Sequence, residues 1–337
     1  MISGAAQGEA LAYPTGAAAR DRFVLDRRGP RAPVDPWRHQ GVVVEQERSA
    51  EGTIVDVATA FLTGRECPWR CVMCDLWHHT LEADTPPGAI PSQIADALSE
   101  LRRREGPFPS QIKLYNAGSY FDRRAVPPSD DPAVARAVAG FDRVIVESHP
   151  ALVGDRAWRL RDLLAPVALE VAMGLETAHP DALGRLNKRI TPEGFRRAAR
   201  ELAAHGVALR VFLLIDPPFI PAAEQDDWLA RSVAFAFDCG ATAVSLIPTR
   251  PGEGALDALA AAGAFTPPGL ARVERAARLA LAAASRGRVF LDLWDFDRLA
   301  RCRACADDRR ARLHRMNLEQ RAYPPVACAA CGGAEVV

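Results

Sequence analysis

Three of the eight cysteines of this chain lie in one short stretch, GRECPWRCVMCDLWHH. Cys67, Cys71 and Cys74 follow one another at a Cys-x3-Cys-x2-Cys spacing. Cysteine thiolates favour soft metal centres, which are either zinc or an iron–sulfur cluster. A structural zinc site takes four protein ligands, and here His78 or His79 would have to supply the fourth. An iron–sulfur cubane on three cysteines instead leaves one iron open to a ligand from outside the chain.

The elements that must position these cysteines follow a repeating pattern. From residue 54 onward, short apolar runs alternate with amphipathic helical stretches, which is typical of a parallel α/β domain. The expected strands are TIVDVATAFL (53–62), QIKLYNA (111–117), RVIVES (143–148), PVALEVAMG (166–174), VALRVFLLI (207–215) and AVSLIP (243–248), with RVFLDLW (288–294) as a candidate seventh. Helices are expected at 91–104, 131–139, 155–164, 191–205, 223–238 and 269–285. TPEGF predicts a helix start with Thr191 as N-cap and Pro192 in the first position.

Six strand–helix units predict an α/β fold, a partial (β/α)6 barrel. A doubly wound open sheet is the competing layout, because periodicity in the sequence does not report whether a sheet closes. In both layouts the chemistry gathers at the C-terminal ends of the strands. The three cysteines directly follow the first expected strand. This position favours the open iron–sulfur cluster over a closed zinc site.

In this position the cysteine motif resembles that of the radical S-adenosylmethionine (SAM) superfamily. The resemblance implies a [4Fe–4S] cluster on Cys67, Cys71 and Cys74, with SAM chelating the fourth iron through its amino and carboxylate groups. It also implies that the cluster, reduced by a donor such as flavodoxin or ferredoxin, passes one electron to the sulfonium and releases methionine and a 5′-deoxyadenosyl radical. Met73 stands where the superfamily usually has an aromatic residue, and it is expected to pack over the adenine.

Further candidates lie at the ends of later strands. YNAGSYFD, after the second expected strand, occupies the place of the small glycine-rich turn of the superfamily. The resemblance therefore implies that Asn116, Gly118 and Ser119 contact SAM, near its amino group. The alternative is an ordinary strand-to-loop turn. Glu147 ends the third strand, where a carboxylate is costly unless it faces a polar cleft or a partner, and it is a candidate cofactor-binding residue.

Two later polar residues have two interpretations each. Glu176, at the end of the fourth strand, is expected either to bind the SAM ribose or to pair with Lys188. Arg250, after the sixth strand, is expected either to meet the SAM carboxylate or to cap its turn. Trp69 and Trp77 flank the cysteines and are expected to shield a cluster from water, which tunes its potential.

Several short sequence motifs at the ends of later strands also resemble those of one branch of the superfamily. GLET…LNKRIT is similar to the branch that contains the Elongator catalytic subunit and the tRNA methylthiotransferases. YNAGSYFD, VIVESHP and GAFTPPGL are most similar to the radical SAM protein of archaeosine synthesis. The resemblance implies a modified tRNA nucleoside as substrate. No acetyltransferase-like, second-cluster or cobalamin-binding domain is expected in the chain, so the reactions of these relatives do not transfer directly.

A second cysteine cluster lies near the end of the sequence. Cys302, Cys305, Cys328 and Cys331 form two Cys-x2-Cys knuckles, which predict a metal site. Four thiolates suit either zinc or a second [4Fe–4S] cluster, since both take the same ligands, and paired knuckles favour zinc. The arginine-rich segment between the knuckles, DDRRARLHRMNLEQR, reads either as a phosphate-contacting patch for RNA or as a solvated helix face.

Composition sets the remaining expectations. The chain has 42 basic and 42 acidic residues, so no global field indicates a nucleic acid or a membrane surface as a partner. It contains no apolar window of transmembrane length and no recognisable secretory signal, and a cytoplasmic protein is expected. The expected domains are an N-terminal, partly disordered extension (1–50), the barrel (51–297) and a cysteine-rich appendage (298–337).

These observations support three hypotheses of function. The first is a radical SAM enzyme that abstracts a hydrogen atom from a tRNA nucleoside. The second is the same chemistry on a small metabolite or peptide, which the neutral charge does not disfavour. The third is a metal-binding adaptor without catalysis, in which both cysteine clusters are structural.

Overall fold

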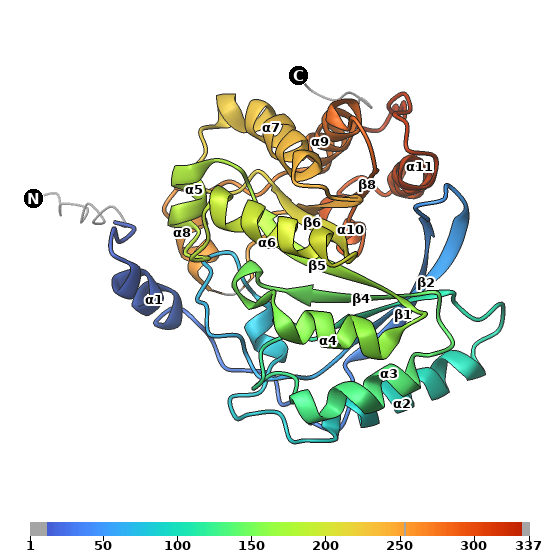
Figure 1. The fold of residues 1–337 in the computed structure, drawn as a ribbon. Helices are drawn as coiled ribbons and strands as arrows, with labels where there is room; N and C mark the ends of the chain where they lie inside the picture. Colours follow the sequence, from blue (N-terminus) through green and yellow to red (C-terminus); the bar gives the residue numbers. More distant parts are fainter. Residues whose placement is uncertain (1–11, 253, 332–337) are drawn as a thin grey trace, which may run out of the picture.

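The computed structural model describes residues 12–252 and 254–331. The described residues contain eight strands, which form one sheet in the order β1 to β8 (Figure 1). The strands are β1 (Gly41–Arg48), β2 (Ile54–Phe61), β3 (Gln111–Tyr115), β4 (Arg143–Ser148), β5 (Ala168–Glu176), β6 (Ala208–Ile215), β7 (Ala243–Pro248) and β8 (Arg288–Leu291). β1 pairs antiparallel with β2, and all later neighbours are parallel.

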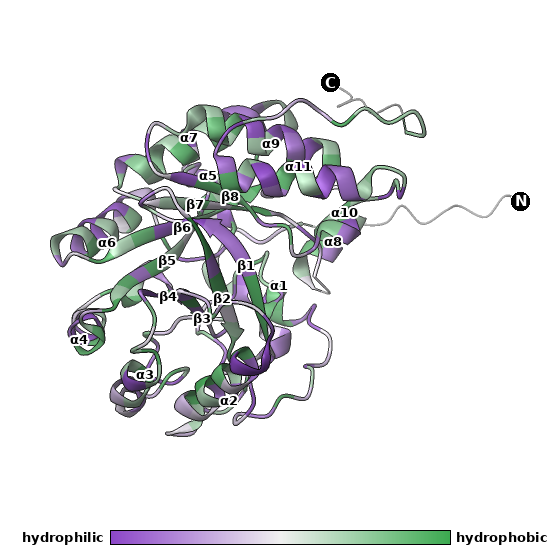
Figure 2. Ribbon diagram, turned by 90° about the vertical axis from the view of Figure 1, so that its right-hand side faces the viewer, coloured by the Kyte–Doolittle hydropathy of each residue, from purple (hydrophilic) through white to green (hydrophobic). Residues whose placement is uncertain are grey.

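The sheet curls into a nearly closed barrel with most of the helices around its outside (Figure 2). From β2 to β8 the spatial order of the strands follows the chain without a reversal. A doubly wound sheet reverses its strand order at a switch point, so that alternative is excluded. The predicted α/β partial barrel is therefore confirmed, and the candidate seventh parallel strand is present as β8.

Helices connect and cover the parallel strands. They are α1 (Ala17–Leu25), α2 (Ala89–Arg103), α3 (Asp131–Ala137), α4 (Asp155–Leu164), α5 (Pro180–Arg185), α6 (Pro192–Ala204), α7 (Gln225–Asp238), α8 (Ala255–Ala261), α9 (Leu270–Ala283), α10 (Phe296–Leu299) and α11 (Ala306–Glu319). α6 begins as predicted, because Thr191 Oγ1 accepts a hydrogen bond from the Gly194 amide at 3.0 Å and Pro192 occupies the first turn. In the part of the chain that is described, no helix has both the length and the apolar character that crossing a bilayer requires.

Side chains alternate between the two faces of each strand, and this alternation separates an apolar shell from a charged interior. On β6, Leu209 and Val211 join the main hydrophobic core, which packs under the helices. Arg210, between them, points to the opposite face and is 2% exposed. Its guanidinium contacts Glu47 and Glu170, each at 2.8 Å. Ion pairs therefore link the side chains that point into the interior of the barrel.

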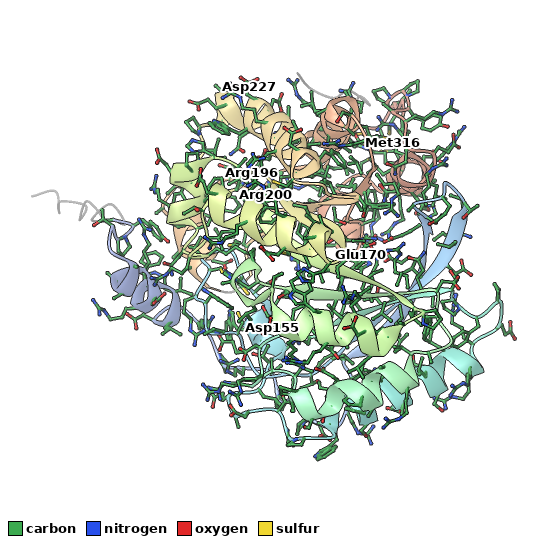
Figure 3. The ribbon with its side chains drawn as sticks, viewed as in Figure 1. Asp155, Glu170, Arg196, Arg200, Asp227 and Met316 are labelled. Carbon is green, nitrogen blue, oxygen red and sulfur yellow. The ribbon has the colours of Figure 1, made fainter. Side chains whose placement is uncertain are left out.

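The ion pairs inside the barrel link strands that are far apart in the sequence. Lys113 on β3 donates to Glu47 on β1 at 2.5 Å, and Arg210 on β6 contacts the same carboxylate. Glu170 on β5, labelled in Figure 3, accepts from Arg210 and is 1% exposed. Buried charges are tolerated only when they are paired and hydrogen-bonded, and these are.

The structure differs from the sequence-based expectation in the N-terminal extension. Residues 41–48, inside the expected extension, form β1 and pair along the full length of β2. The turn between the two strands ends at Gly52, whose φ of +89° favours glycine. The sequence did not predict this strand because a proline- and arginine-rich segment precedes it. Residues 12–40 contain α1, while residues 1–11 lie outside the described part.

The C-terminal helix α11 lies beside β8 and β1 (Figure 1), where no ladder joins the two strands in the described residues. Asn317 donates to the Leu291 carbonyl and accepts from the Leu291 amide, both at 2.8 Å. Gln320 does the same with Val289, at 2.9 and 2.6 Å. Two side-chain amides therefore occupy the edge of β8 as a neighbouring strand would.

Candidate active site and metal centre

The three N-terminal cysteines lie in the loop after β2, at the C-terminal mouth of the barrel. Each is a free thiol close enough to the other two for their charges to interact. Burial raises the pKa of the Cys71 thiol to about 12 and raises those of Cys67 and Cys74 as well. The nearby Lys188 ammonium opposes this for Cys67 and Cys71. Such thiols become thiolates when a metal binds them.

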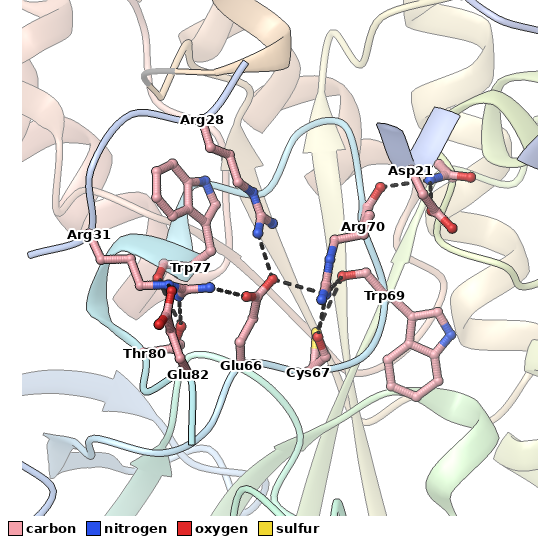
Figure 4. Close-up of polar contacts among 11 residues, drawn as sticks. Asp21, Arg28, Arg31, Glu66, Cys67, Trp69, Arg70, Trp77, Thr80 and Glu82 are labelled. Atoms are coloured by element: carbon pink, nitrogen blue, oxygen red, sulfur yellow. Dashed lines mark hydrogen bonds and ion pairs between the residues drawn. The ribbon is translucent and has the colours of Figure 1, made fainter. Parts of the chain in front are cut away.

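A carboxylate fixes the start of the cysteine loop. Glu66 accepts from Arg28 at 2.8 Å and from Arg70 at 2.9 Å, and it also pairs with Arg31 (Figure 4). Burial alone would raise the pKa of the Glu66 carboxyl, but the three arginines hold it below its ordinary value. Because Arg28 and Arg31 follow α1, this cluster fastens the N-terminal segment to the cysteine loop.

The far side of the loop is tied to the segment after α5. The Val72 amide donates to the Leu186 carbonyl at 3.0 Å, and Asn187 Nδ2 donates to the Arg70 carbonyl at 2.7 Å. These bonds fix the backbone on both sides of Cys71. The cysteine loop is therefore held at the mouth of the barrel by backbone contacts on two sides.

Trp69 forms one wall of the site. Its indole stacks on the His149 ring, with 3.5 Å between ring centroids and 10° between planes. His149 Nδ1 accepts from the Ala151 amide, so Nε2 carries the proton and donates to the Lys188 carbonyl at 2.8 Å. Burial and the Lys188 charge lower the pKa of His149 to about 3. The ring is a neutral stacking platform at neutral pH.

The predicted glycine turn lies against the cysteine loop. A Cβ placed on Gly118 would stand 3.6 Å from the Cys67 Cβ. The Gly118 amide donates to Glu147 Oε1 at 3.2 Å. Burial raises the pKa of the Glu147 carboxyl to about 7, although the backbone N–H groups of the turn oppose the shift. The Ser119 hydroxyl already has a partner within the protein, because its Oγ accepts a hydrogen bond from the His149 amide.

The side-chain amide of Asn116, in this turn, lacks hydrogen-bond partners in the described part of the chain. It is fully buried, yet neither Nδ2 nor Oδ1 has a hydrogen-bond partner among the described residues. A buried amide without partners costs free energy, and a bound ligand commonly supplies what is missing. The turn therefore offers polar groups beside the cysteines that the protein itself does not use.

Glu176 and Lys188 form a buried pair, with 2.5 Å between Oε1 and Nζ. A Cβ on Gly174 would come within 3.0 Å of both atoms, so only glycine leaves them room. Burial alone would lower the pKa of Lys188, but Glu176 and Cys71 raise it above its ordinary value. Of the two interpretations of Glu176, the structure shows the pair with Lys188.

Arg250 bridges two segments at the mouth. Its guanidinium contacts Asp75, directly after the third cysteine, at 3.3 Å and Asp295 at 2.6 Å. A Cβ on Gly252 would collide with Asp75, which explains the glycine there. Met73 is partly buried and packs against the apolar cluster under α1 that contains Phe23. The roles predicted for Arg250 and Met73 in SAM binding stay predictions.

Three strand ends at the mouth have strained backbones. Ala117, Glu176 and Asp216 follow or end β3, β5 and β6, and they have φ values of 55°, 67° and 51°. Residues other than glycine rarely adopt such φ values. The residues that do so are concentrated at functional sites. The sequence analysis did not predict this strain, nor did it predict Glu66 or the stack of Trp69 on His149 as parts of the site; Lys188 was expected only as a possible partner of Glu176.

The C-terminal cysteines form a compact site of a different kind. The Sγ atoms of Cys302 and Cys328 are 4.0 Å apart, and those of Cys305 and Cys331 are 3.8 Å apart. All four lie within 4.8 Å of one another. In the described part of the chain, no other group of three or more potential ligands is this compact.

The arginines between the knuckles have partners. Glu274 accepts from Arg309 and contacts Arg312 at 3.2 Å, and both arginines thereby anchor α11 to α9. The other ion pairs of this segment are Arg310–Asp297, Arg315–Glu319 and Arg321–Glu319. The structure therefore supports the interpretation of a structural and solvated helix face over that of an RNA patch.

No family model matches the chain. It is 26% identical over 244 residues to archaeosine synthase subunit beta of Methanosarcina acetivorans, covering 69% of each chain. It is also 26% identical over 150 residues to an uncharacterized protein of Methanocaldococcus jannaschii, covering 43% of this chain and 41% of that protein. Similar solved structures include Elp3 of Methanocaldococcus infernus, with a TM-score of 0.48, 14% identity and coverage of 60% of this chain and 52% of that one. Methylornithine synthase has a TM-score of 0.49 and 12% identity, with coverage of 76% and 68%.

A barrel of this topology with three cysteines in the loop after its first parallel strand defines a class of enzyme. The likeness of this chain to its curated relative is consistent with an enzyme of the radical SAM type, as the cysteine motif predicts. That relative is archaeosine synthase subunit beta, the protein whose motifs the sequence resembles.

Proposed function

We propose that Cys67, Cys71 and Cys74 hold a [4Fe–4S] cluster and that SAM binds beside it at the barrel mouth. When bound, the two supply the reductive cleavage of SAM and a 5′-deoxyadenosyl radical. The observation that carries the proposal is that Cys67, which lies close to the other two thiols, packs against the Gly118 turn next to the unpartnered amide of Asn116. The turn offers SAM backbone and amide groups, while the cysteines leave one iron unligated.

The residues around the thiols fit an anionic cluster. Lys188 places a buried positive charge near Cys67 and Cys71, and Glu176 keeps that ammonium protonated. Trp69 stacks on His149 beside Cys67, where it would shield a bound cluster from water. Burial and charge near a cluster set its potential, so these residues tune the electron transfer. We propose a flavodoxin or ferredoxin as the electron donor.

We propose a modified tRNA nucleoside as the substrate from which a hydrogen atom is abstracted. The support is the likeness to archaeosine synthase subunit beta together with the motif strings of the same branch. No basic global charge assists RNA binding, so contacts would have to be local. Incubation of the reduced enzyme with SAM and bulk tRNA, followed by nucleoside analysis, tests this. An unchanged nucleoside profile together with turnover on a small metabolite would overturn the choice of substrate.

We propose zinc at the four C-terminal cysteines. In a tetrahedral site with Zn–S bonds of about 2.3 Å the sulfur atoms lie about 3.8 Å apart. The two Sγ pairs at 3.8 and 4.0 Å match that edge. In a [4Fe–4S] cluster each thiolate binds a different iron, which spreads the sulfur atoms further. Elemental analysis of the aerobically purified protein should give one zinc per chain, and iron at these cysteines after reconstitution would contradict the proposal.

One experiment tests the central proposal. The protein is reconstituted anaerobically with iron and sulfide, then given dithionite and SAM, and 5′-deoxyadenosine is measured. Cys71→Ala should lose the cluster absorbance and the product. Cys239→Ala, which removes a lone buried cysteine behind α7, is the matched control and should retain both. Product formation by Cys71→Ala, or none by the wild type, would refute the proposal.

A further inference from the structure

The end of the barrel opposite the cysteines contains a cavity of about 660 Å³. Three connections line it, namely the β1–β2 turn (48–52), the segment before β7 (240–242) and the segment before β8 (286–288), together with Gln320 after α11. These connections lie at the N-terminal ends of the parallel strands. The cavity is therefore separate from the cysteine site, which lies at the C-terminal ends.

Arg288 lines the cavity, and its buried guanidinium group has no carboxylate partner among the described residues. Arg288 is 7% exposed, and its Nε and Nη1 donate to the carbonyls of Thr242 and Arg48 at 3.2 and 3.0 Å. Among the described residues it forms no ion pair, and its Nη2 has no hydrogen-bond partner. Burial lowers the pKa of Arg288, and Arg210 contributes in the same direction, while Glu170 and Glu47 oppose the shift. An uncompensated buried charge is costly, and an anion would offset it.

Two further arginines add to the charge of the cavity. Arg48 donates to the Leu318 carbonyl and forms no ion pair with a described carboxylate. Arg286 is exposed, and its nearest carboxylate, Asp238, is 3.9 Å away and exposed as well. Among the described residues that line the cavity, only Glu51 is acidic. Three arginines and one acidic residue thus line the cavity.

We propose that this cavity binds a small phosphate-bearing anion. Guanidinium groups bind phosphate oxygens through paired, charge-assisted hydrogen bonds, and here they come from two separate connections, the β1–β2 turn and the segment before β8. The volume lies in the range of sites for small molecules, so a free phosphate, a diphosphate or a nucleotide has room. A bound anion would join the β1–β2 turn to the segment before β8, and so would hold the first and last strands of the sheet together.

Titration calorimetry on the full chain in chloride buffer tests the proposal with three probes, namely inorganic phosphate, pyrophosphate and ATP. Arg286→Ala is the test variant because this side chain is exposed and its removal leaves the core intact, unlike that of Arg288. Arg159→Ala, an exposed arginine on α4, is the matched control. The wild type and Arg159→Ala should bind at least one probe at one site per chain. Arg286→Ala should bind it about tenfold or more weakly.

The three probes distinguish the sources of the phosphate group. Equal affinity for phosphate and pyrophosphate would identify a single phosphate group as the ligand, while tighter binding of ATP would identify a nucleotide. Either result supports the site. The absence of binding by all three probes would overturn the proposal. Equal affinity in wild type and Arg286→Ala, or an equal loss in Arg159→Ala, would overturn it as well.

Discussion

Lys188 and Glu176 are the residues whose pairing bears most directly on the cysteines. Their side chains are 13% and 8% exposed, and the ammonium lies close enough to Cys67 and Cys71 to act on their charge. Removing one member of a buried pair leaves an uncompensated charge, which costs more than the pair contributes. Gly174 allows the pair to form, because any side chain there would displace it.

Lys188→Met should therefore destabilise the fold by about 3 kcal/mol, because it leaves the Glu176 carboxylate buried alone. The double variant Lys188→Met/Glu176→Gln should recover a large part of that loss. Urea unfolding of the single and double variants measures both effects. Additive losses in the double variant would show that the two residues do not act as a pair.

Glu147 makes stability depend on pH. Its pKa is raised to about 7 in the folded chain, above the unfolded value near 4.5. The folded state therefore keeps a proton that the unfolded state has lost. This stabilisation is complete below pH 4.5 and is lost as the pH rises through about 7. From pH 4.5 to pH 8 the unfolding free energy of the wild type should fall by about 3 kcal/mol relative to that of Glu147→Gln.

Urea unfolding across this pH range provides the measurement. Glu193→Gln, which changes an exposed carboxylate at the start of α6, is the control and should show no such trend. A difference between wild type and Glu147→Gln that stays constant with pH would contradict the shift.

At the scale of elements, α11 replaces the strand that would close the barrel. Asn317 and Gln320 satisfy the amide and carbonyl groups of Leu291 and Val289 on the open edge of β8. The same helix packs into the core through Leu313 and Met316, the second of which is labelled in Figure 3. An uncovered strand edge is a template for pairing with other chains.

Asn317→Ala/Gln320→Ala should leave two backbone N–H groups unsatisfied and cost about 3 kcal/mol in unfolding free energy. It should also increase aggregation on heating, which light scattering would detect. His314→Ala, on the exposed face of the same helix, is the control. Equal stability of the double variant and the control would show that the amide contacts do not protect the edge.

The elements that sequence could predict are those whose apolar runs are buried on both sides or lead into a capped helix. β2 to β8 and the start of α6 are of this kind. β1 escaped prediction because its side chains are half-exposed and it follows a proline-rich segment. The cysteine motif was readable because its ligands are close in sequence. Trp69 was also expected beside the cysteines, and Lys188 was named as a possible partner of Glu176. The stack of Trp69 on His149 and the position of Lys188 near the thiols arise only in space, so the sequence did not reveal them.

At the scale of the whole molecule, the C-terminal metal site fastens the edge of the barrel. Cys302 and Cys305 precede α11, with Cys305 as its N-cap, while Cys328 and Cys331 follow it. A metal bound by the four thiolates closes this segment into a loop whose folding free energy depends on the metal. The position of the edge-covering helix thus depends on the proposed zinc.

Removal of the metal with a chelator should increase hydrogen exchange in β8 and α11 by at least tenfold, while α2 and α4 on the other side of the barrel stay protected. Exchange measured by mass spectrometry checks this. Cys302→Ser/Cys328→Ser should reproduce the effect without a chelator, and Cys239→Ser should not. Uniform exchange throughout the chain, or none, would show that the metal site does not act on the edge of the sheet.

The side-chain amides on β8 also set the order in which the protein can be completed during synthesis. β1 leaves the ribosome early, but Asn317 and Gln320 follow almost all of the sheet, and Cys331 follows them. Domains generally fold from the N-terminus as the chain emerges. Until α11 has been made, the last strand has an uncovered edge. Supply of the metal at the final step then decides how long each new chain stays exposed to its neighbours.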